Sequence, residues 1–126
     1  MTPSELRGRT KVFALAVSRT LGQAADSAGV GYHAAGQVIR SSAAVAANYR
    51  AVGLARSLAD FTAKLGVVVE EADETVFWLE YLKESTTPDP ALDALLHEAG
   101  QLVRIFMASR RTALRRRNAQ RASMPR

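Results

Sequence analysis

Residues 37–84, QVIRSSAAVAANYRAVGLARSLADFTAKLGVVVEEADETVFWLEYLKE, decide the fold of this chain. Small side chains dominate the first half of the stretch, and apolar residues recur every three or four positions in both halves. That period is typical of amphipathic α-helices. Ser57 and Asp60 mark a break, because a serine followed by an acid in the first turn caps a helix N-terminus. The stretch therefore predicts two long helices, over residues 32–55 and 58–84.

Apolar residues also recur every three or four positions before this stretch. Thr2, Pro3 and Glu5 carry the pieces of a capping box, with proline at the first helical position. They predict a first helix that ends near residue 26. Gly29 and Gly31 then predict a helix stop and a turn within residues 26–31, since glycine adopts a left-handed conformation without penalty.

After the stretch, residues 85–89 form a short polar loop, and Asp89 with Pro90 restarts a helix. The apolar stripe of this fourth helix fades into arginine near residue 115. No segment alternates between apolar and polar residues as a half-buried strand does. We therefore predict an all-α fold, an antiparallel up-down-up-down four-helix bundle over residues 1–117, with a basic disordered tail at 118–126.

Length and composition agree with a single domain. The chain has 126 residues and no cysteine, which excludes disulfides, thiolate metal sites and a cysteine nucleophile. No apolar run approaches the ~20 residues that span a bilayer, and residues 1–11 lack the apolar core of a signal peptide. We expect a soluble, cytoplasmic protein.

The net charge of +5 is unevenly distributed. Residues 110–126 hold seven arginines and no acid, whereas residues 1–109 hold ten Lys and Arg against twelve Asp and Glu. A basic segment of this kind is a candidate phosphate-binding arm. The alternative is that its arginines complement the helix dipole and dock onto the acidic helix of a neighbouring copy.

Enzymatic chemistry finds no support in the sequence. A carboxylate-bridged metal site in a bundle needs Glu-x-x-His pairs, and neither His33 nor His97 has a glutamate three residues earlier. Gly29 and Gly31 lack the lysine and the preceding strand of a phosphate loop. No serine lies in a glycine-flanked elbow. We expect no enzyme, no metal and no cofactor.

Aromatic residues widen the apolar face of the helix over residues 58–84. Phe77, Trp78 and Tyr81 lie beside the main apolar seam of that helix. Exposed aromatic clusters usually mark an interface. This pattern favours a homo-oligomer with this helix near the contact, and the alternative is that a rotated helix buries all three in its own core.

Several of these residues follow one another in the order of a known family. Gln37, Arg40, the small residues 43–47, Asn48, Arg56, Ser57, Asp60-Phe61 and the acidic run 70–74 are the elements concerned. Together with Asn48-Tyr49-Arg50-Ala51 and Phe77-Trp78-Leu79-Glu80, they resemble the four-helix-bundle family named after products encoded in intervening sequences of bacterial 23S ribosomal RNA genes. The resemblance covers roughly residues 5–115. Two departures are Ile39-Arg40 in place of a basic pair, and Tyr49-Arg50-Ala51 where an acid usually follows the asparagine.

This resemblance implies an antiparallel bundle that assembles into a ring-like homopentamer, in a family mostly of unknown function. The accessory proteins of diversity-generating retroelements are related, share the fold and form a basic pentamer that binds nucleic acid and a reverse transcriptase. For this chain the resemblance therefore implies three kinds of partner: further copies of itself, RNA or DNA, and a reverse transcriptase.

Charge supplies the candidate binding residues. Arg40, Arg50 and Arg56 belong to a segment without acids, and repeating them around a ring would attract phosphate without reading bases. Their alternative role is surface or intersubunit pairing with the acids of residues 70–84. Asn48 and Tyr49 are candidates for the oligomer interface with Phe77, Trp78 and Tyr81. The remaining nucleic-acid candidates are Arg110, Arg111, Arg115, Arg116 and Arg117.

The function expected from the sequence is that of a nucleic-acid-associated accessory protein. The alternative function is a structural or scaffolding oligomer that binds a protein partner and has no nucleic-acid role.

Overall fold

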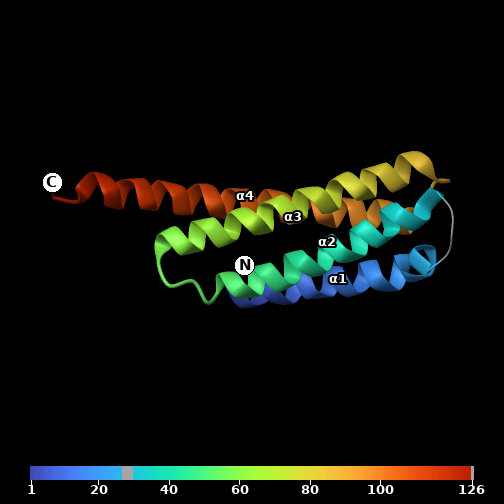
Figure 1. Cartoon of the computed structure of the whole chain (residues 1–126), viewed down its shortest axis with the longest axis horizontal. Helices are drawn as coiled ribbons and strands as arrows, with labels where there is room; N and C mark the ends of the chain where they lie inside the picture. Colours follow the sequence, from blue (N-terminus) through green and yellow to red (C-terminus); the bar gives the residue numbers. More distant parts are fainter. Residues whose placement is uncertain (27–29, 126) are drawn as a thin grey trace.

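The computed structural model describes residues 1–26 and 30–125 of the chain. These residues form four α-helices and no strand: α1 (Pro3–Asp26), α2 (Val30–Val52), α3 (Leu58–Ser85) and α4 (Pro90–Ser123). The expected all-α class is therefore confirmed for the described residues. In Figure 1 the helices lie side by side, and each runs opposite to the one before it along the long axis.

The predicted capping residues begin α1 and α4. The backbone N–H of Glu5 donates to Thr2 Oγ1 at 3.0 Å, and the backbone N–H of Thr2 donates to Glu5 Oε2 at 3.3 Å. At α4 the backbone N–H of Ala91 donates to Asp89 Oδ1 at 3.0 Å, and Pro90 occupies the first turn. These contacts satisfy N–H groups that have no partner inside the helix.

Ser57 caps α3, because its Oγ accepts a hydrogen bond from the backbone N–H of Asp60 at 3.0 Å. We expect Ser57→Ala to lower the free energy of unfolding by about 1 kcal/mol, since that N–H loses its acceptor. Urea denaturation followed by circular dichroism measures the effect. Ser57→Thr keeps a hydroxyl and is the matched control. An equal loss in both variants would mean that the cap contributes nothing.

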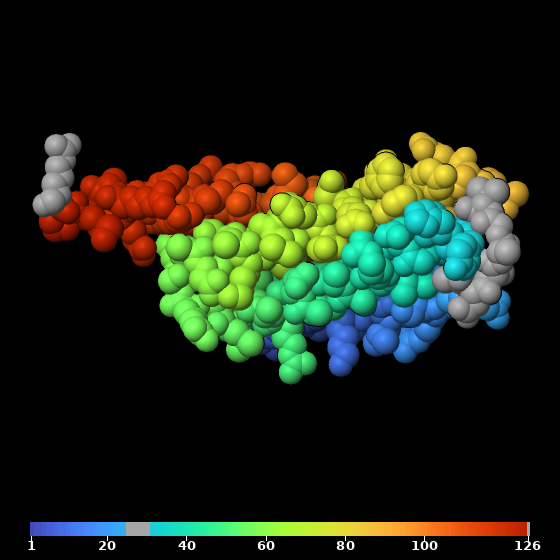
Figure 2. Space-filling model, in the orientation of Figure 1, coloured from blue at the N-terminus to red at the C-terminus, as the bar shows by residue number. Residues whose placement is uncertain are grey.

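The four helices do not contact one another equally. α2 lies between α1 and α3, α3 packs against both α2 and α4, and α1 contacts α4 over a smaller area. Figures 1 and 2 show that the C-terminal part of α4 projects past the other three helices, at the end where α2 joins α3. The last turns of α4 therefore have solvent on most sides.

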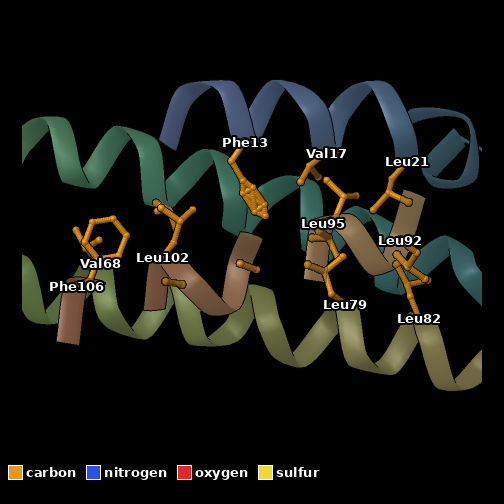
Figure 3. Packing of buried hydrophobic residues seen from close by; sticks show 14 of the residues in the cluster. Phe13, Val17, Leu21, Val68, Leu79, Leu82, Leu92, Leu95, Leu102 and Phe106 are labelled. Carbon is orange, nitrogen blue, oxygen red and sulfur yellow. The ribbon is translucent and has the colours of Figure 1, made fainter. Parts of the chain in front are cut away.

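The core follows the apolar stripes read from the sequence. Figure 3 shows side chains from α1, α3 and α4 pointing toward one another between the helices. On α3 the predicted apolar seam is buried from Leu65 onward, and α2 contributes small residues that bring its backbone close to its neighbours. The buried members of these two helices are Thr62, Leu65, Val68, Ala72, Thr75, Leu79 and Leu82 of α3, and Ala34, Ala35, Val38, Ser41, Ser42, Val45 and Val52 of α2.

Buried hydroxyl groups are satisfied locally. Each donates to a backbone carbonyl three or four residues earlier in its own helix, and Thr75 Oγ1 also lies 2.8 Å from Ser41 Oγ across the α2–α3 contact. A buried polar group costs little when it is hydrogen-bonded. The buried hydroxyl residues are Thr10, Ser41, Ser42, Thr62 and Thr75.

The limits of α2 differ from the prediction. The helix begins at Val30, so Gly31 lies in its first turn and not in a loop. The predicted turn residue Gly29 falls outside the described residues. At the other end α2 stops at Val52, three residues early, because residues 53–55 close i→i−3 hydrogen bonds that tighten the chain.

The predicted tail also differs from the structure. α4 continues through the expected boundary at residue 117 to Ser123. Alanine, glutamine and arginine are good helix formers, and no glycine or proline occurs after Gly100 until Pro125. The basic segment is thus helical over most of its length. None of the helices in the described ranges is long and apolar enough to cross a membrane.

Candidate nucleic-acid interface

Basic side chains gather at one end of the bundle. Residues 1–11, 45–71 and 102–125 make up the half from which α4 projects, and they hold 13 Lys and Arg against four Asp and Glu. Residues 12–24, 31–44 and 72–101 make up the other half and hold three against seven. The boundary lies at the small internal cavity that Phe13, Val45, Ala72 and Leu102 help to line. We call the first half the basic end.

The projecting part of α4, residues 115–123, is the arginine arm. Arg115, Arg116 and Arg121 are exposed, and Arg117 is partly exposed. None of them forms an ion pair with another residue of the described chain. Three consecutive arginines point in different directions around a helix, since successive residues are 100° apart. The arm therefore presents positive charge on several sides.

Arg110 and Arg111 come just before the arm and have different surroundings. The Nε of Arg110 donates to the backbone carbonyl of Thr62 at 3.4 Å, and the guanidinium lies over Gly66 of α3. A Cβ at position 66 would be 3.0 Å from Arg110 Nε, so the missing side chain makes room for the arginine. Arg110 thus joins α4 to α3, whereas Arg111 is exposed.

Arg40 forms ion pairs with two acids of its own chain. Its guanidinium donates to Glu74 and lies 3.5 Å from Glu71 Oε2, while its Nε donates to Gln37 Oε1 at 3.2 Å. The hydrogen bond to Glu74 and the attraction of both carboxylates raise the pKa of Arg40. Glu71 Oε2 is buried without a hydrogen-bond partner, so the nearby Arg40 charge is what compensates it.

Arg50 and Arg56 lie at the basic end, apart from Arg40. Arg50 is exposed on the last turn of α2 and forms no ion pair within the described residues. Arg56 is exposed in the α2–α3 connection, where its backbone N–H donates to Asp60 Oδ2 at 3.1 Å. Lys64 bonds the same carboxylate at 2.6 Å, and these contacts lower the pKa of Asp60. The structure therefore separates Arg40 from the two arginines with which the sequence grouped it.

The aromatic residues of α3 divide into an inner and an outer part. Trp78 is partly buried against the core, and its ring meets His33 of α2 edge-on with centroids 5.3 Å apart. Phe77 and Tyr81 flank Trp78 but remain 55% and 45% exposed. Trp78 packs inward while Phe77 and Tyr81 face outward, so the alternative in which the helix buries all three in its own core is wrong. The oligomer interface stays a prediction.

Tyr49 and Asn48 occupy different positions relative to the core. The ring of Tyr49 packs against the buried Phe106 of α4, with centroids 5.2 Å apart. Burial raises the pKa of the Tyr49 hydroxyl, and the charge of Arg7 acts in the opposite direction. Asn48 is partly exposed on α2. The ring of Tyr49 therefore packs within its own chain.

A groove between α1 and α2 was missed by the sequence reasoning. It measures about 870 Å³ and runs along the outer side of both helices. Arg7 and Lys11, one helical turn apart on α1, join Arg50 at its rim. The i, i+4 spacing of these two basic residues was the available signal, but only the pairing of α1 with α2 places Arg50 beside them. Within residues 1–26 and 30–125 no three His, Asp or Glu side chains gather in a way that could hold a metal ion.

Comparisons with known proteins concern the fold. No protein-family model matches the chain, and no curated protein matches its sequence. Among solved structures, the chain is similar to a protein of unknown function from the S23 ribosomal protein family of Bacteroides thetaiotaomicron VPI-5482. The two are 22% identical, the match covers 88% of this chain and 99% of that chain, and the TM-score is 0.76. This likeness shows a common four-helix fold.

Proposed function

We propose that this chain is a non-enzymatic helical bundle that binds the backbone of RNA or DNA through its basic end. In this proposal the up-down-up-down bundles assemble into a ring-like homo-oligomer, with five copies as the resemblance implies, and act in the cytoplasm. A reverse transcriptase is the protein partner that the resemblance adds. The proposed role is that of an accessory protein, which places nucleic acid without reacting with it.

The observation that carries the proposal is the excess of arginines without carboxylate partners at one end of the molecule. Four arginines on the arm have no ion pair among the described residues, and Arg111 lies one turn before them. Unpaired cations attract phosphate, and binding gains free energy as counterions leave the nucleic acid. A ring would repeat the arm in every copy and multiply this attraction.

The composition of the arm points to backbone contacts and not to base recognition. Residues 115–123 contain no aromatic side chain on which bases could stack. Arginine binds phosphate well because its planar fork of N–H groups matches the oxygens. We therefore expect similar affinities for nucleic acids of different sequence. Arg40 is not part of this surface because it already forms ion pairs with Glu71 and Glu74.

Titration of labelled RNA and DNA of mixed sequence at several salt concentrations tests the proposed function. We expect an affinity that falls steeply with salt, by a factor on the order of 10³ between 50 and 200 mM for about six phosphate contacts. An absence of binding at low salt would overturn the nucleic-acid role. That result would favour the scaffolding alternative, in which the arm binds acidic residues such as Glu80 and Glu84, which are exposed and unpaired within the described chain.

A further inference from the structure

The outer side of α3 carries an exposed ridge of apolar and acidic side chains. Val67, Phe77 and Tyr81 are 45%, 55% and 45% exposed, and the rings of Phe77 and Tyr81 lie with their centroids 6.5 Å apart. Glu70 and Asp73 are exposed among them and form no ion pair with any described residue. We call these five residues the α3 ridge. In Figure 2 this helix lies between α2 and α4, and its outer side is uncovered.

The groove between α1 and α2 has the opposite character. Small and basic residues line it together with Leu15 and Leu54, and no acid is among the lining residues. We use the word floor for the small lining residues and the word rim for the basic ones. The rim residues Arg7, Lys11 and Arg50 form no ion pair within the part of the chain that the structure describes. The floor residues are Gly8, Ala14, Ala43, Ala46 and Ala47. We call this surface the α1–α2 groove.

We propose that the α3 ridge of one copy docks in the α1–α2 groove of the next copy. This inference rests on the proposed homo-oligomer and names the contact that would build it. Large aromatic side chains on the ridge fit over small residues on the groove floor, and the ridge acids meet the basic rim. The lengths also agree, since residues 67–81 and residues 4–18 each span about 21 Å at 1.5 Å per residue.

The two surfaces have no residue in common, so the contact is heterologous. Each copy uses its ridge toward one neighbour and its groove toward the other, which gives a closed ring when the rotation between copies closes. The arginine arm belongs to neither surface. Assembly by this contact therefore leaves the arm free for phosphate, while Arg50 binds the neighbouring copy and not nucleic acid.

Two variants at exposed positions separate the surfaces. Phe77→Arg puts a positive charge on the ridge, against the basic rim, and Ala47→Trp fills the groove. Met107→Arg and Ala91→Trp make the same kinds of change on exposed parts of α4 outside both surfaces. Sedimentation velocity gives the mass of each protein, and circular dichroism verifies that each keeps its helices.

We expect the wild type and both controls to sediment as the same oligomer, and each of the two variants alone to sediment as a monomer. An equimolar mixture of the two variants should form a heterodimer, because only the intact ridge of one and the intact groove of the other can combine. Variants that keep the wild-type mass, or a mixture that stays monomeric, would overturn the proposed contact. A monomeric wild type would overturn the homo-oligomer itself, whereas nucleic-acid binding is measured separately.

Discussion

Truncation after Leu114 is expected to remove most of the salt-dependent affinity for RNA and DNA. The cut takes away Arg115, Arg116, Arg117, Arg121 and Arg126. Each phosphate contact contributes a slope of about 0.9 to the fall of log affinity with log salt on B-DNA. Five contacts therefore correspond to a slope of roughly 4.5, and their loss lowers affinity at low salt by about 100-fold or more. Fluorescence anisotropy with a labelled duplex and a labelled single strand measures both quantities.

The position of the cut follows from packing. Ala113 is 4% exposed and belongs to the bundle, and Arg110 crosses onto α3 over Gly66. A cut after Ser109 would remove both Arg110 and Ala113. A loss of binding could then not be told apart from a loss of stability. Truncation after Leu114 keeps these contacts, and its unfolding transition should stay close to that of the full chain.

A full-length control separates charge from chain length. The control is a full-length variant with glutamine at positions 115, 116, 117 and 121, which keeps helix propensity and removes only charge. We expect this variant to bind RNA and DNA as weakly as the truncated protein. Arg40→Ala removes one arginine that is paired inside the subunit, and its salt slope should equal that of the wild type. An unchanged slope in the truncated protein would show that the arm does not bind phosphate.

Local signals in the sequence were sufficient to place most helix starts. Thr2 with Glu5, Ser57 with Asp60, and Asp89 act within one turn of chain, so nothing distant can change their partners. Apolar periodicity likewise identified the buried side of α3, because a helix in a bundle must bury its apolar stripe. These are the features for which sequence and structure agree.

Features that depend on neighbouring helices could not be read in the same way. Arg40 and Glu74 are 34 residues apart, and their contact requires the α2–α3 packing. Arg110 lies over Gly66 for a similar reason, since α4 must cross α3 at that point. The α1–α2 groove also needs two helices. The sequence grouped arginines by their position along the chain, whereas their roles follow from the partners that the bundle brings to them.

Phe106→Ala is expected to give the largest loss of stability, about 3–5 kcal/mol. Phe106 is fully buried, packs against Tyr49 and belongs to the same core cluster as Val68. Removing the ring loses its transfer free energy and leaves a cavity that the four helices cannot fill without moving together. Urea denaturation at one fixed protein concentration measures the loss, so that the proposed self-association would affect every variant under the same conditions.

Met107→Ala is the matched control for this change. Met107 is the next residue on α4 but is 47% exposed, so its truncation should alter the free energy of unfolding by about 0.5 kcal/mol or less. Phe106→Leu should fall between the two, because it retains part of the buried volume. A loss below about 1 kcal/mol in Phe106→Ala would contradict a well-packed core at this position. Since Phe106 and Tyr49 lie at the basic end, a large loss would also show that core packing there holds in place the helix from which the arginine arm extends.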